Sequence, residues 1–149
     1  MTAVATRQAD QVTRAGLPLT RLAMLWAAGT GIAVLLVASA YLVAQELADP
    51  LVVAGAGEVT LDDVTGFTIF GATVGAALAV AIGRFSRRPR LTFLAVTLIA
   101  LAGYAVVPFT AAGSFGTALW LNLFHLVVAV PVIGMLARWL PGDRTSVEA

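Results

Sequence analysis

The chain contains neither cysteine nor lysine among its 149 residues. Without cysteine it has no disulfide bonds, no thiolate metal ligands and no thiol nucleophile. Charged residues make up only 11% of the sequence, against about a quarter in ordinary soluble domains. Hydrophobic residues reach 60%, which is more apolar sequence than a soluble fold of this length hides in one core. The composition therefore excludes an ordinary soluble domain and indicates a membrane protein.

Long apolar runs lie at about 22–43, 64–83, 91–109 and 117–139. Each holds about 20 residues, and at about 1.5 Å per helical residue this length matches the roughly 30 Å hydrocarbon core of a bilayer. We therefore expect an all-α fold, an integral membrane four-helix antiparallel bundle formed by residues 20–140. We expect residues 1–19 to be a disordered cytoplasmic tail and residues 141–149 to be a second cytoplasmic tail.

All nine basic residues are arginines, and they fall on one side of this predicted topology. They precede the first apolar run, connect the second to the third, and follow the fourth: Arg7, Arg14, Arg21, Arg84, Arg87, Arg88, Arg90, Arg138 and Arg144. The connection between the first and second runs carries only acidic charges. This positive-inside pattern predicts cytoplasmic N- and C-termini and a larger extracytoplasmic loop between the first and second helices. The arginines are spread over three short segments, so we expect no nucleic-acid partner.

A cleaved signal peptide is an alternative interpretation of the first apolar run. A basic segment precedes it, and Ala38-Ser39-Ala40 resembles an A-x-A cleavage site. The apolar stretch nevertheless continues through Ala44, beyond the length of about 7–15 residues that is typical of a signal peptide's hydrophobic region. We therefore favour an uncleaved first span.

The predicted outer connection, residues 45–65, contains two β-prone runs around Gly55-Ala56-Gly57. This pattern is typical of a small hairpin, although an irregular loop that touches lipid headgroups fits it equally well. Glu58, Asp62 and Asp63 lack the alternating spacing of a calcium-binding loop, so we interpret them as a solvated acidic rim and as helix caps.

Small residues predict where the helices touch. Gly71, Gly75, Ala79 and Gly83 recur every four residues in the second run, and a smaller group containing Gly31 lies with Ala27 and Ala28 in the first. Helices in lipid associate through close van der Waals contact, so a glycine ridge indicates a contact face. The partner helix can belong to the same chain or to another copy, which leaves a homo-oligomer or a partner membrane protein open.

The main polar cluster at membrane depth is Asn122 and His125, three residues apart on one helical face. One hypothesis is structural: both side chains hydrogen-bond across the bundle and hold two helices in register. The others are a proton relay, a ligand contact and a single axial ligand to haem. A lone histidine is a weak metal signal, because zinc normally takes three or four protein ligands. We favour the structural role and expect no cofactor, metal or catalytic residue.

The order of these features resembles a known family. A glycine-ridged span is followed by the turn F-S-R-R-P-R and by a last span that contains N-L-F-H-L-V-V-A-V-P-V-I-G. Over about Leu22 to Leu140 the chain resembles a family of small four-helix actinobacterial membrane proteins catalogued only as a domain of unknown function. Its best motif is His125-Leu126-Val127-Val128 followed by Pro131. The resemblance implies four spans and a bacterial plasma-membrane location, and it brings no activity and no catalytic residues.

We therefore expect a non-enzymatic multi-pass membrane protein in the lipid bilayer that acts as an accessory or structural partner. A small oligomeric transporter or channel is the alternative, and it would need a polar pathway that begins at Asn122 and His125. A haem- or quinone-linked protein is the third hypothesis, and its single histidine leaves haem ligation incomplete.

Overall fold

The computed structural model describes residues 19–48 and 50–141, so most of both expected tails lies outside the described residues. Within them the order of elements is α2 (Leu19–Leu47), β1 (Val52–Val53), β2 (Gly57–Glu58), α3 (Leu61–Phe85), α4 (Pro89–Tyr104), α5 (Val107–Ala111) and α6 (Phe115–Trp139). Four helical segments are long and apolar enough to cross a membrane, with α4 and α5 together forming the third. The predicted all-α class is confirmed.

Polar side chains define where the helices begin. Thr60 caps α3: its hydroxyl accepts a 3.2 Å hydrogen bond from the Asp63 backbone N–H, and the Asp63 carboxylate accepts one of 2.9 Å from the Thr60 N–H. This reciprocal pair is a capping box. Ser114 caps α6 by accepting a 3.0 Å hydrogen bond from the Thr117 N–H. The sequence predicts helix caps among the acidic residues here, whereas Thr60 fills the N-cap position and Asp63 contributes the carboxylate three residues later.

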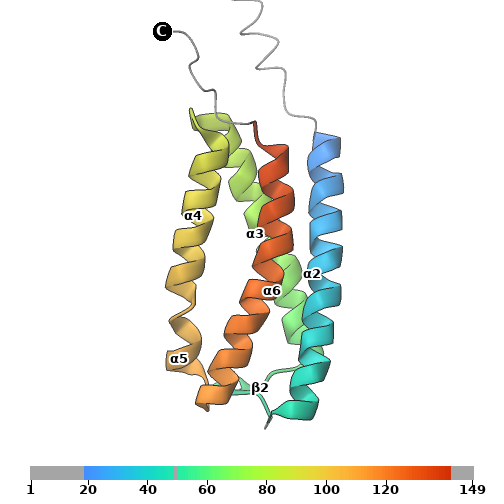
Figure 1. The fold of residues 1–149 in the computed structure, drawn as a ribbon, viewed down its shortest axis with the longest axis vertical. Helices are drawn as coiled ribbons and strands as arrows, with labels where there is room; N and C mark the ends of the chain where they lie inside the picture. The colour runs from blue at the N-terminus through green and yellow to red at the C-terminus, as the bar shows by residue number, and fades with distance from the viewer. Residues whose placement is uncertain (1–18, 49, 142–149) are drawn as a thin grey trace, which may run out of the picture.

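The third span is interrupted where the sequence predicts one helix over 91–109. Helix α4 ends at Tyr104, and α5 begins at Val107. Pro108 explains the break, because a proline lacks the N–H that would bond to the carbonyl four residues earlier, and its ring crowds that carbonyl. The residue four positions before Pro108 is Tyr104. Pro131 has a milder effect: α6 remains one helix but changes direction along its length in Figure 1.

The connection between α2 and α3 folds as the hairpin. Strands β1 and β2 pair antiparallel, with Val52 opposite Glu58. Gly55 and Gly57 have φ values of 78° and 92°, a left-handed conformation that glycine adopts without a steric penalty. A third segment joins the pair, because the Gly113 N–H donates a 2.8 Å hydrogen bond to the Val52 carbonyl. The hairpin therefore ties the α2–α3 connection to the α5–α6 connection.

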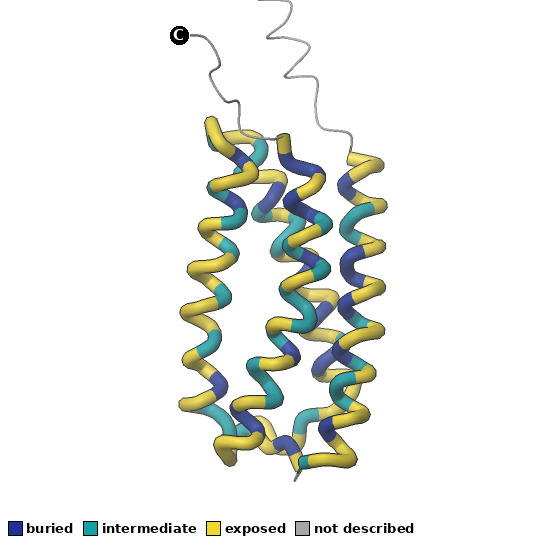
Figure 2. Tube along the Cα trace, viewed as in Figure 1, coloured by how far each residue is buried: buried dark blue, intermediate teal, exposed yellow. Residues whose placement is uncertain are grey.

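The core lies mainly where α6 meets α2 and α3. One cluster of buried residues includes Ala33, Ala79 and Leu136, and a second one nearer the hairpin includes Val37 and Phe124. Figure 2 shows buried and exposed stretches alternating along the helices. The outward surface is apolar: large side chains such as Leu35 (71% exposed) and Ile99 (73% exposed) face away from the core. Such a surface suits lipid rather than water.

The described charges separate between the two ends of the molecule. Figure 1 places the start of α2, the α3–α4 connection and the end of α6 at one end, and the hairpin at the other. The first end carries only basic charge among the described residues: Arg21, Arg84, Arg87, Arg88, Arg90 and Arg138. The hairpin end carries the described acidic residues: Glu46, Glu58, Asp62 and Asp63. We call these the arginine end and the hairpin end.

Candidate functional site

The polar pair predicted from the sequence lies on the hairpin half of α6. His125 is ten residues into this helix, which places it about 15 Å from the first residue. His125 and Asn122 are both half-buried. They share one helical face, as their spacing predicts, and that face looks toward α4.

His125 contacts α4 through an aromatic ring rather than through a polar group. Its imidazole meets the ring of Tyr104 edge-on, with the two centroids 4.7 Å apart and the planes at 66°. Edge-to-face packing of this kind contributes about 0.5–1.5 kcal/mol beyond the burial of apolar area. Tyr104 is the last residue of α4, so the break before Pro108 sets the position of its ring. No sequence pattern pointed to Tyr104, whose one available signal is its position four residues before that proline.

The predicted hydrogen bonds across the bundle are absent among the described residues. The Nδ1 atom of His125 is buried without a hydrogen-bond partner among the described residues. The Asn122 Nδ2 atom donates a 3.0 Å hydrogen bond to the Ala118 carbonyl of its own helix. The expected hydrogen bonding between helices is therefore wrong for both residues, because a ring contact and a bond within α6 take its place.

Three threonine hydroxyl groups within the spans are satisfied locally. Thr73 donates a 2.8 Å hydrogen bond to the Ile69 carbonyl, and Thr97 donates one of 2.8 Å to the Phe93 carbonyl. Thr68 makes the same bond to the Val64 carbonyl. Each partner lies one turn earlier in the same helix, as expected for threonine in a span. These groups therefore offer no continuous polar path through the bundle.

The glycines of α3 separate into different surroundings. A Cβ atom built on Gly75 would lie 3.4 Å from Leu136 Cδ1, so this glycine meets α6. Gly71 is exposed, and a Cβ atom there would have no neighbour within 4 Å. Gly83 is half-buried near the arginine end. Within the chain, the buried face of α3 is formed by Val64, Thr68, Ala72 and Ala79.

Helix α2 packs tightly against α6 at Gly29, which lies outside the contact face predicted from the sequence. A Cβ atom on Gly29 would lie 3.2 Å from Met135 Cβ and 3.4 Å from the Pro131 carbonyl oxygen. Gly31 has no neighbour within 4 Å of such an atom, and Ala27 and Ala28 are exposed. The predicted contact face of the first helix therefore makes no contact at Gly31 within the described chain. The signal that identifies the correct face is the spacing of four from Gly29 to Ala33 and Val37.

These residues do not converge on one chemical site. His125 and Leu136, the contact of Gly75, are eleven residues apart on α6, or about 16 Å along the helix. Among the described residues, no group of three or more His, Cys, Asp or Glu side chains could hold a metal ion. The arrangement therefore joins helices through small residues and one aromatic pair.

Comparison with known proteins adds a family and no activity. Neither the curated proteins nor the solved structures provide a match to this chain. The model of a family described as a family of unknown function, DUF6069, matches residues 18–141. The match includes every helix and both strands of the described structure. The chain therefore belongs to the DUF6069 family.

Proposed function

We propose that this protein is a non-enzymatic multi-pass protein of the bacterial plasma membrane, where it serves as an accessory or structural partner of another membrane protein or of a second copy. Its helices form an antiparallel bundle with both termini in the cytoplasm. The hairpin lies outside, between the first and second spans.

The separation of charge supports this orientation. The described arginines gather at one end, the described acidic residues gather at the other, and all of them are exposed. Arginines next to a span favour the cytoplasmic side during insertion, and they are attracted there by anionic lipids.

The observation that carries the proposed role is the free surface of α4. This helix buries only Pro89 and Phe93, which lie in its first two turns at the arginine end. Beyond Phe93 it presents large apolar side chains, including Leu98 (58% exposed) and Ile99 (73% exposed). A helix that contributes so little to its own bundle has an apolar face available for another transmembrane helix.

A photoreactive side chain placed on α4 tests this role. The full chain would carry the crosslinker at Ile99 in cells, and a matched variant would carry it at Leu35, which is exposed on α2. We expect Ile99 to give a discrete protein–protein adduct and Leu35 to give lipid adducts alone. Lipid adducts alone at both positions would contradict the proposed role.

An oligomeric transporter has one observation in its favour, the buried and unpartnered Nδ1 atom of His125. An unsatisfied imidazole at membrane depth is a candidate proton-accepting group. The Oγ1 atom of Thr30 on α2 is also buried without a partner among the described residues, so this condition is not special to His125. Proton flux into liposomes that contain the protein, lost in His125→Phe, would support transport, and equal flux in both proteins would oppose it.

A further inference from the structure

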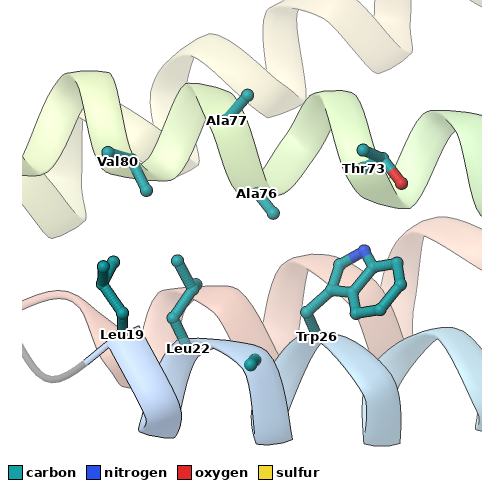
Figure 3. Close-up of a pocket in the computed structure, with 8 residues that line it drawn as sticks. Leu19, Leu22, Trp26, Thr73, Ala76, Ala77 and Val80 are labelled. Atoms are coloured by element: carbon teal, nitrogen blue, oxygen red, sulfur yellow. The ribbon is translucent and has the colours of Figure 1, made fainter.

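An open groove runs between α2 and α3 at the arginine end, with a volume of about 330 Å³. Its walls are almost entirely apolar and include Leu19, Ala23 and Trp26 of α2 and Thr73, Ala76 and Val80 of α3. Figure 3 shows these side chains on two facing helices, with the indole of Trp26 standing at one end, opposite Thr73. The Thr73 hydroxyl bonds to its own helix, whereas the indole Nε1 of Trp26 is buried without a hydrogen-bond partner among the described residues.

The lining of this groove lies within the depth of one bilayer leaflet. Its α3 residues run from Thr73 to Val80, seven residues or about 10 Å, and Arg84 lies one further turn toward the arginine end. Half of the roughly 30 Å hydrocarbon core is about 15 Å. A helix from a second copy would cross both leaflets, whereas the lining of this groove reaches from the arginine end only as far as Trp26 and Thr73, within the depth of one leaflet. The dimensions therefore favour a lipid chain.

Charge at the mouth of the groove indicates which lipid fits. Arg84 lies one turn beyond Val80, so it continues the face of α3 that lines the groove. Its side chain is exposed, and the described residues of this end carry no acidic group. An arginine presents paired N–H donors that suit a phosphate group, and its uncompensated positive charge favours a lipid of net negative charge over a zwitterionic one. A lipid whose chain lies in the groove brings its phosphate to this level.

We propose that the α2–α3 groove is a binding site for one anionic phospholipid, with an acyl chain between Ala23 and Ala76 and the phosphate at Arg84. The inference rests on the proposed orientation only in naming the cytoplasmic leaflet as the source of the lipid. Lipid binding to the purified protein does not depend on its orientation in a membrane. A negative binding result would therefore contradict the lipid site without contradicting the proposed function.

Native mass spectrometry of the full chain in detergent measures this binding directly. The probes are phosphatidylglycerol and phosphatidylcholine with identical palmitoyl and oleoyl chains, each added at the same concentration. We expect one retained lipid per chain and a preference for phosphatidylglycerol of about fivefold, since one arginine at an anionic surface contributes about that factor.

Matched variants separate the chain site from the headgroup site. Ala23→Phe fills the groove, whereas Ala28→Phe places the same ring on the exposed opposite face of α2. Arg84→Gln removes the charge at the mouth, whereas Arg90→Gln removes one from α4, which does not line the groove. Ala23→Phe should lose both lipids, and Arg84→Gln should lose only the preference between them. Both control variants should bind as the original chain does.

Three results would overturn the proposal: no lipid retained, equal loss in Ala23→Phe and Ala28→Phe, or equal loss of preference in Arg84→Gln and Arg90→Gln. A dimer that becomes a monomer only in Ala23→Phe would also overturn it, because a second copy would then occupy the groove. The thermal unfolding temperature of each variant, compared with that of the original chain, shows whether a variant that no longer binds lipid is still folded.

Discussion

At the scale of the residue, His125 joins two helices through its ring. The imidazole packs edge-on against Tyr104 while its Nδ1 atom is buried without a partner among the described residues. Leaving a buried polar group unpaired costs about 1–3 kcal/mol. The contact that holds α4 to α6 at this depth is therefore aromatic, and the polar character of His125 is a cost to the fold rather than a source of stability.

This interpretation predicts an order of stability among variants of His125. His125→Phe keeps the ring and removes the unpaired nitrogen, so its free energy of unfolding should equal or exceed that of the original chain. His125→Gln and His125→Ala lose the ring contact and should be destabilised by about 1 kcal/mol. Thermal unfolding in detergent measures all three. If Gln preserves stability and Phe does not, His125 acts as a hydrogen-bonding group, contrary to this account.

At the scale of the element, individual glycines set how closely the helices approach. Gly29 meets Met135 and the Pro131 carbonyl oxygen, and Gly75 meets Leu136, so α6 contacts a glycine on each of two neighbours. Gly31 and Gly71 lie on the same two helices in open surroundings. The chain thus offers a glycine in contact and a glycine in open space on both α2 and α3.

The effect of a leucine substitution on stability should depend on whether the glycine contacts α6. Gly29→Leu and Gly75→Leu force a side chain into α6 and should destabilise the protein by about 1–3 kcal/mol, the usual cost of overpacking. Gly31→Leu and Gly71→Leu meet no neighbour and should leave the unfolding temperature in detergent unchanged. Destabilisation at Gly31 or Gly71 as large as at its counterpart would show that the helices pack on other faces.

The sequence predicts the helices better than it predicts their contacts. Run length indicates the four long helices, and the rule for proline explains the break at Tyr104 once Pro108 is considered. The packing faces of the helices are harder to predict from the sequence, because a membrane helix is apolar all round and hydrophobicity no longer marks its buried side. Gly31 is as small as Gly29, and only the three-dimensional register of α2 against α6 separates them. Predicting the contact of His125 with Tyr104 would also have required knowing where α4 ends and where α6 begins.

At the scale of the whole molecule, the helices have an apolar lateral surface, and the two ends of the molecule carry charges of opposite sign. The helices present large apolar side chains outward, the described arginines lie at one end, and the hairpin with its acidic neighbours closes the other. The charge pattern along the sequence anticipated this separation, because the first connection between apolar runs carries only acidic residues and the second carries only arginines, whereas the third is uncharged. The proposed orientation in the membrane follows from it.

Accessibility of single cysteines tests that orientation most directly, since the chain has no cysteine of its own and each introduced thiol is unique. Ala56→Cys places a thiol at the exposed tip of the hairpin, and Phe85→Cys places one at the arginine end, where Phe85 is 83% exposed. A membrane-impermeant maleimide added to intact spheroplasts should label Ala56→Cys and should label Phe85→Cys only after the membrane is permeabilised. Labelling of Phe85→Cys in intact spheroplasts would contradict the proposed topology.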